Sequence, residues 1–171
     1  MNLIVTSVNG HHGALKGGTV SYPCTLGRGG IQVKKREGDG ITPAGQFPIR
    51  ALWYRADRLP RPQTRLPEYE IRRASGWCND PEDPYYNCPV KLPFRASTEA
   101  LWREDHVYDL LVVLGHNDDP VIPYGGSAIF LHIANPNFSP TGGCVAIDRD
   151  ALLEIVGRLD TQSYIEISPA K

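Results

Sequence analysis

The sequence has no long apolar run, no excess of charge of either sign and few cysteines, and each shortage excludes a class of protein. None of its apolar segments approaches the roughly 18 residues that span a bilayer, so no transmembrane segment is expected. The 171 residues carry a formal net charge of −1. This charge argues against nucleic acid as a partner, because phosphate binding needs a basic excess. The opening stretch MNLIVTSVNGHH also lacks the basic and apolar regions of an export leader.

The four cysteines, Cys24, Cys78, Cys88 and Cys144, form no CxxC pair of the kind that zinc ribbons use, so a structural metal site is not expected. Cys78 and Cys88 bracket a polar loop, CNDPEDPYYNC, which is either pinned by a disulfide or flanked by two free thiols. Cys24 ends a β-like run and is expected to pack as a small apolar residue. A bond between Cys24 and Cys144 would block chemistry at Cys144.

Short β-rich runs separated by turn residues dominate the chain, and 41% hydrophobic residues suit one globular domain with a sizeable core. Runs rich in β-branched and aromatic residues predict strands of a mixed or antiparallel sheet at residues 2–8, 18–24, 45–57, 107–115, 127–134, 144–147 and 163–168. Two segments have a helical pattern: 97–105, and 148–159 with Asp148 as N-cap. The segment 58–70 contains three prolines, which exclude a central strand and favour a surface loop.

The segment SAIFLHIANPNFSPTGGCVAI places a histidine twelve residues before a cysteine. A thiol is a weak nucleophile until its proton is removed, and the imidazole of His132 is suited to remove the proton of Cys144. The two glycines before the cysteine allow backbone N–H groups to turn towards a substrate, as an oxyanion hole requires. Taken alone, the same residues fit a buried inert cysteine and a hydrogen-bonded structural histidine equally well.

A second motif, GDGITPAGQF at residues 38–47, is a turn cluster that leads into a predicted strand. Together, the two segments resemble the YkuD-type L,D-transpeptidase catalytic domain. Its members carry a similar GDGxTPxGxF segment upstream and a histidine followed by a Gly-Cys signature near the end. The resemblance covers about residues 1–168 and implies that residues 1–171 form a single catalytic domain. The implied fold is mostly β, a YkuD-like mixed β-sheet sandwich with one or two short helices.

The resemblance also assigns roles to individual residues. Cys144 matches the nucleophile that forms a thioester with a donor peptide stem, and His132 matches the general base. Gly143, together with Cys144, is expected to direct backbone N–H groups at the oxyanion. Thr141 stands at the Ser/Thr of the family segment [ST]HGC and is expected to contact substrate. The implied partner is peptidoglycan, through its peptide stems and glycan, and the reaction needs no metal or other cofactor.

Two positions depart from the family pattern. Gly142 replaces the second histidine of [ST]HGC, and Ala146 stands where many members have an arginine. Without the histidine and arginine side chains, the donor site is expected to be wider and to bind charged groups of the substrate less strongly. Gly142 is expected to line this site. Relatives that resemble this chain include a branch that forms 1,3-crosslinks. We therefore expect L-Ala at stem position 1 as the donor and diaminopimelate at position 3 as the acceptor.

Other polar and aromatic residues are candidates for substrate contacts. His116 opens a loop after an apolar strand, and it either faces the substrate or is structural. Trp77 and Tyr85, together with Trp53, either line a groove for glycan or peptide stem or close the core.

Two other classes of function fit the same residues. With water as the acceptor, the nucleophile would give an L,D-carboxypeptidase or a peptidoglycan amidase. With an inert Cys144, the domain would be a non-catalytic cell-wall-binding module. We expect a periplasmic or cell-envelope location because the implied substrate is peptidoglycan, and not because the sequence shows a leader segment. We also expect a monomer.

Overall fold

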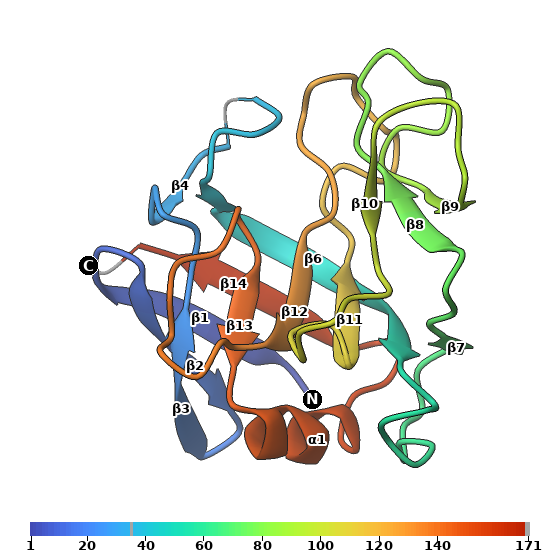
Figure 1. Cartoon of the computed structure of the whole chain (residues 1–171). Helices are drawn as coiled ribbons and strands as arrows, with labels where there is room; N and C mark the ends of the chain where they lie inside the picture. Colours follow the sequence, from blue (N-terminus) through green and yellow to red (C-terminus); the bar gives the residue numbers. More distant parts are fainter. Residues whose placement is uncertain (35, 170–171) are drawn as a thin grey trace.

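Eight strands form one mixed sheet that closes on itself into a barrel (Figure 1). The computed structural model of the chain describes residues 1–34 and 36–169. Around the barrel the order is β11 (Leu110–Leu114), β12 (Phe130–Ile133), β13 (Val145–Ile147), β3 (Val20–Thr25), β2 (His12–Gly17), β1 (Leu3–Asn9), β14 (Tyr164–Ser168) and β6 (Gly45–Tyr54). Pairing of β6 with β11 closes the barrel. Neighbouring strands are antiparallel, except that β1 is parallel to β14 and β12 is parallel to β13.

Side chains alternate between the inner and the outer face of the barrel wall, because successive residues of a strand point to opposite faces. Along β11, Leu110, Val112 and Leu114 pack in the core inside the barrel, whereas Leu111 and Val113 join a second apolar cluster outside it. These two clusters, the inner core and the outer cluster, lie on opposite sides of the same strands.

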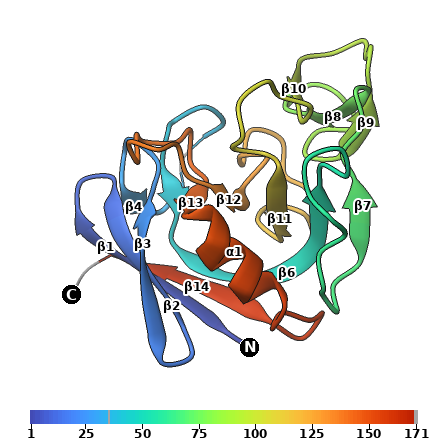
Figure 2. The same cartoon turned by 60° about the horizontal axis from the view of Figure 1, so that its bottom comes forward.

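One helix, α1 (Arg149–Val156), is present in the described part of the chain, and it lies across one open end of the barrel (Figure 2). The side chain of Asp148 accepts hydrogen bonds from the backbone N–H groups of Asp150 and Ala151, which confirms Asp148 as the N-cap. The buried face of the helix joins the inner core.

A smaller sheet lies against the outer face beside β11 and β12 (Figures 1 and 2). Its three antiparallel strands are β10 (Thr98–Ala100), β8 (Ser75–Cys78) and β9 (Pro89–Lys91), in that order. Trp77 of this sheet packs edge-on against Phe130, with ring centroids 5.1 Å apart. The outer cluster is therefore a second core between the barrel and the small sheet.

Short strands complete the fold. β7 (Glu68–Glu70) runs parallel to β6 outside the closed barrel, and β4 (Ile31–Gln32) pairs in parallel with β5 (Thr42–Pro43). The segment 58–67 contains no strand, and β7 pairs through one edge only. The expected exclusion of the proline-containing segment from the centre of a sheet is therefore confirmed.

The expected mostly-β fold is confirmed, and each of the seven predicted runs contains an observed strand. The main mixed sheet of this fold closes into an eight-stranded barrel. The strand β2 was not predicted, because its sequence is rich in glycine and reads as a turn. Pairing with β1 on one side and β3 on the other supplies its backbone hydrogen bonds.

The predicted helix at 97–105 is wrong. Residues Thr98–Ala100 form β10, where Glu99 pairs with Trp77 of β8. The backbone carbonyls of residues 103–105 accept hydrogen bonds from the guanidinium groups of Arg55 and Arg58. These tertiary partners satisfy the backbone of the segment in a strand and a turn, and so override its local helical preference.

All four cysteines are free thiols in the structure, and Cys24 and Cys144 pack in different cores. Of the two interpretations of the Cys78 and Cys88 loop, the structure shows the free thiols. Over residues 1–34 and 36–169, no helix has the length and apolar character needed to cross a membrane.

Candidate active site

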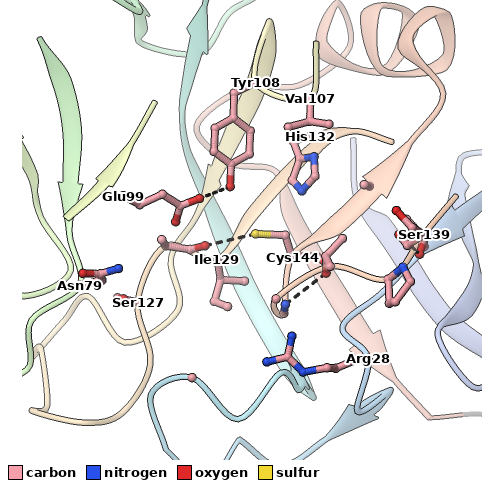
Figure 3. A pocket seen from close by; sticks show the side chains of 18 of the residues that line it. Arg28, Asn79, Glu99, Val107, Tyr108, Ser127, Ile129, His132, Ser139 and Cys144 are labelled. Carbon is pink, nitrogen blue, oxygen red and sulfur yellow. Dashed lines mark hydrogen bonds between the residues drawn. The ribbon is translucent and has the colours of Figure 1, made fainter. Parts of the chain in front are cut away.

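The alternation of β12 and β13 brings the predicted base and nucleophile to one face of the barrel. Leu131 of β12 pairs with Val145 of β13, and both point into the inner core. The neighbouring residues in each strand therefore point outward, which places His132 and Cys144 in the same cavity (Figure 3). This cavity has a volume of about 380 Å³, and we call it the cysteine cavity.

The Cys144 thiol is held by two backbone groups. Its Sγ donates to the carbonyl oxygen of Ala128 at 3.2 Å, and the backbone N–H of Phe130 donates to Sγ at 3.3 Å. Burial raises the pKa of the Cys144 thiol to about 12. In this resting arrangement the sulfur is a neutral thiol, so its proton must be removed before it can attack a carbonyl.

His132 is fixed by a backbone partner on its far side. Its Nδ1 lies 2.8 Å from the carbonyl oxygen of Ile133, which fits a donated N–H and leaves Nε2 as the basic nitrogen. Burial lowers the pKa of His132 to about 4, so the imidazole is neutral near pH 7. A neutral imidazole is the form that can accept a thiol proton.

Thr141 and Gly143 build the turn that leads into Cys144. The Thr141 hydroxyl donates to the Cys144 carbonyl at 2.7 Å and accepts from the Gly143 N–H at 3.1 Å. Gly143 has φ +144°, and a Cβ there would lie 2.9 Å from the Ile41 carbonyl oxygen. Only glycine fits this position without strain. In the resting structure the Gly143 N–H thus donates to the Thr141 hydroxyl. An oxyanion would have to replace that hydroxyl as the acceptor of this N–H.

The GDGITP motif meets the cysteine motif at this contact. Asp39 accepts hydrogen bonds from the Lys34 ammonium at 2.7 Å and from the Ile41 N–H at 3.0 Å. The adjacent Thr42 hydroxyl accepts from the Gly27 N–H at 2.8 Å. This network holds the Ile41 carbonyl against Gly143, so the upstream motif shapes the turn that carries the cysteine.

The two positions that depart from the family pattern both line the cysteine cavity. A Cβ added at Gly142 would have no atom within 4 Å, so the space above this residue is open. Ala146 is fully buried. A cation enters the same cavity from another strand: Arg28, which follows β3, lies along the lower wall in Figure 3.

Among the charged or polar residues of this cavity that sequence reasoning missed are Arg28, Glu99 and Tyr108. Tyr108 is buried against His132, with ring centroids 5.1 Å apart, and its hydroxyl donates to Glu99. Glu99 lies in the segment that was assigned to a helix, and no local pattern indicates that β10 faces the cysteine. Burial raises the pKa of Glu99, and the charge of Glu99 in turn contributes to the raised pKa of Cys144.

Three of the residues predicted to bind substrate lie outside the cysteine cavity. Trp77 is buried between the two sheets and donates its indole N–H to Asn87 at 3.0 Å. It lines a second, largely aromatic cavity of about 370 Å³ together with Trp53. Tyr85 is half exposed on a loop and packs edge-on against Phe94. The His116 ring packs edge-on against Phe47, with its Nε2 3.1 Å from the Gly125 carbonyl oxygen.

Within the described ranges, no group of three or more His, Cys, Asp and Glu side chains is arranged to hold a metal ion.

Comparisons with known proteins agree with the motifs. Residues 2–167 match the family model of the YkuD L,D-transpeptidase catalytic domain. The crystal structure of L,D-transpeptidase 1 of Mycobacterium tuberculosis is similar over 99% of this chain and 62% of that chain, with 13% sequence identity and a TM-score of 0.42. The chain thus spans less than two thirds of that protein. Among curated proteins none matches. Because the family model covers nearly the whole chain, the protein belongs to the YkuD L,D-transpeptidase catalytic domain family.

Proposed function

We propose that this domain is a peptidoglycan L,D-transpeptidase that uses Cys144 as its nucleophile and His132 as its base. The observation that carries the proposal is that His132 of β12 and Cys144, which directly precedes the parallel strand β13, both line one cavity on the outer face of the barrel. Membership of the family supplies the reaction class and the substrate, peptide stems of the cell wall. We extend the proposal to residues 1–171 as a single catalytic domain, acting as a monomer in the cell envelope.

The first half of the reaction forms a thioester. The Cys144 proton turns from the Ala128 carbonyl to Nε2 of His132, and the sulfur attacks an amide carbon of the donor stem, forming a C–S bond. The developing oxyanion is held by backbone N–H groups at Cys144 and Gly143, the latter after it leaves the Thr141 hydroxyl. The C–N bond then breaks, and the imidazolium gives its proton to the leaving amine.

The second half transfers the acyl group to another stem. The side-chain amine of diaminopimelate in a neighbouring stem attacks the thioester carbon, a C–N bond forms and the C–S bond breaks. The proton released from the attacking nitrogen passes to His132, and the sulfur leaves as thiolate, which regains that proton. An isopeptide crosslink results, without ATP or metal.

We place the donor bond at L-Ala, the first stem residue, with diaminopimelate at the third position as the acceptor. The open space above Gly142 supports this choice, because a wide donor site can take a carbonyl that is far from the end of a stem. Arg28 lines the cavity opposite the Glu99 side, and its guanidinium forms no ion pair within the described residues. It is available for a stem carboxylate that the family's missing arginine would otherwise hold.

Incubation with purified disaccharide-tetrapeptide and analysis of the products by mass spectrometry tests the proposal. Crosslinked dimers support a transpeptidase, shortened monomers identify the hydrolase alternative, and unchanged substrate contradicts both. Fragmentation of a dimer then assigns the donor bond. A donor half that retains only its first stem residue supports L-Ala, whereas one that retains three residues overturns that assignment.

A further inference from the structure

The Glu99 side chain is partly buried, and its carboxylate forms no ion pair with a cation among the described residues. The Tyr108 hydroxyl donates to its Oε1, and among the described residues no lysine, arginine or histidine forms an ion pair with it. The guanidinium of Arg103, whose positive charge acts on Glu99, is itself paired with Asp105 at 2.6 Å. Glu37, which also lines the cavity, adds a second negative charge on this side. Charges that are shielded from water are normally paired, and no cation is paired directly with this partly buried carboxylate among the described residues.

Two further oxygens in the same wall lack donors. Asn79 Oδ1 and Ser127 Oγ are buried and accept no hydrogen bond from the described residues. Both residues line the cysteine cavity, and Figure 3 shows them beside each other below Glu99. The wall therefore offers a carboxylate, an amide oxygen and a hydroxyl oxygen, all of which can accept hydrogen bonds. A ligand that fits this set has several N–H donors and a positive charge.

Glu99 opposes the first half of the reaction. Its negative charge contributes to the raised pKa of Cys144, and so disfavours the thiolate that attacks the donor. It would also repel a stem carboxylate from this side of the cavity. Figure 3 shows that the Cys144 sulfur points towards the Glu99 side, while Arg28 lies on another wall. A group that hinders acylation but lies next to the acylated sulfur is suited to the step that follows acylation.

We propose that Glu99, Asn79 and Ser127 form the binding site for the ammonium group of the acceptor stem. The proposal rests on the transpeptidase function and adds the residues that select the acceptor. An ammonium presents three N–H donors, one for each of the three acceptor groups, and a positive charge that complements the negative charge of the Glu99 carboxylate. Tyr108 is a positioning residue: its hydroxyl fixes Oε1 of Glu99.

The same carboxylate can prepare the amine for attack. An ammonium has no free electron pair, so it must lose one proton before the C–N bond forms. Burial raises the pKa of Glu99, which makes its carboxylate a better acceptor for that proton. After transfer Glu99 is neutral, the amine attacks the thioester, and the second proton passes to His132 as described above. Glu99 returns its proton to solvent when the product leaves.

The test measures how the acyl-enzyme divides between crosslinking and hydrolysis. Wild-type protein and the Glu99→Gln variant are acylated with disaccharide-tetrapeptide, and disaccharide-tripeptide with a free diaminopimelate amine is then titrated. The matched control is Glu166→Gln, which changes an exposed strand glutamate on β14. We expect Glu99→Gln to need at least tenfold more acceptor for half of the thioester to be crosslinked, with hydrolysis taking the remainder. Glu99→Asp should recover part of the loss, and Tyr108→Phe should give a smaller shift in the same direction.

Each outcome has one meaning. An unchanged division between crosslinking and hydrolysis in Glu99→Gln overturns the acceptor site, and so does an equal shift in Glu166→Gln. Failure of the wild-type protein to form a thioester at Cys144 overturns the underlying function instead. If Glu99→Gln fails to fold, Asn79→Ala takes its place, because removal of its unpaired oxygen should weaken the acceptor in the same assay.

Discussion

Cys24 and Cys144 lie on opposite sides of the barrel wall, and the two regions around them differ in access and in neighbours. Both side chains are buried, at 1% and 7% exposure, and burial raises the pKa of each thiol to about 12. Cys24 is surrounded by the inner core, whereas Cys144 borders a cavity that also contains His132. Burial and thiol pKa therefore do not distinguish a nucleophile from core filling. The neighbouring base and the open cavity do.

The wall between the two regions also excludes a bond between the two sulfurs. Cys24 pairs with Ile147 across β3 and β13, and its side chain points into the inner core. Cys144 precedes β13 and points into the outer cluster. A disulfide that would block the candidate nucleophile is thus incompatible with the barrel, and each cysteine can be changed separately.

The largest effect is expected from exchanging the two cysteines for alanine in turn. Cys144→Ala should abolish the acyl-enzyme, because no other sulfur lies in the cavity among the described residues. Cys24→Ala should keep the chemistry and lower the free energy of unfolding by about 1–2 kcal/mol through a cavity in the inner core. Whole-protein mass after incubation with a carbapenem, whose strained carbonyl mimics the donor amide, measures the first effect, and urea unfolding measures the second. An adduct on Cys144→Ala would remove the assignment of the nucleophile.

The second prediction concerns His132, the imidazole that lines the same cavity as Cys144 and is not part of the inner core around Cys24. His132→Ala should lower the rate of thioester formation by about two to four orders of magnitude, since the thiol then has no base to accept its proton. The measurement is single-turnover acylation with the variant's circular dichroism as a control for folding. A folded variant with the wild-type rate would show that another group accepts the proton.

The third effect is a pH dependence of stability that only the outer region produces. The pKa of His132 is lowered by burial from 6.5 to about 4, so the unfolded chain takes up a proton between these values while the folded protein does not. The free energy of unfolding should therefore fall by about 3 kcal/mol as the pH drops from 6.5 to below 4, at 1.36 kcal/mol per pKa unit. Urea unfolding of wild type and His132→Gln across this range measures the contribution. The same slope in both proteins would assign it to other groups.

The smallest effect separates two adjacent glycines of the outer region. Gly143→Ala should cost about 1–3 kcal/mol of stability, because its Cβ meets the Ile41 carbonyl at a φ that disfavours side chains. Gly142→Ala is the matched control, since its Cβ would enter open space. Thermal unfolding of the two variants checks the difference. Equal stability would mean that the turn before Cys144 relaxes away from Ile41.

Sequence patterns were sufficient where the structure is local. The β-branched and aromatic residues of 127–134 and 144–147 predicted the strand that carries His132 and the strand that follows Cys144, and Asp148 predicted the start of the helix. Sequence patterns were insufficient where residues far apart in the sequence are brought together by strand pairing and packing. Glu99 faces the cysteine cavity because β10 pairs with β8, which itself packs on the barrel, and nothing within 97–105 encodes that arrangement.

Arg28 illustrates the same limit from another direction. Comparison of motifs showed that position 146 lacks a cationic side chain, but it did not show that a turn far away in the sequence supplies one to the same cavity. A missing residue in a motif describes one position only, whereas the charge of a site is a property of every segment that reaches it.

The empty space above Gly142 has a consequence for inhibitor chemistry. A compound that acylates Cys144 can place a substituent where a Cβ of residue 142 would stand, because no protein atom outside the neighbouring residues lies within 4 Å of that position. Family members with a histidine at this position present an imidazole in the same place. A compound with a substituent directed over Gly142 would therefore bind this protein in preference to those relatives. The size of the substituent, and not the reactivity of the compound, would determine this selectivity.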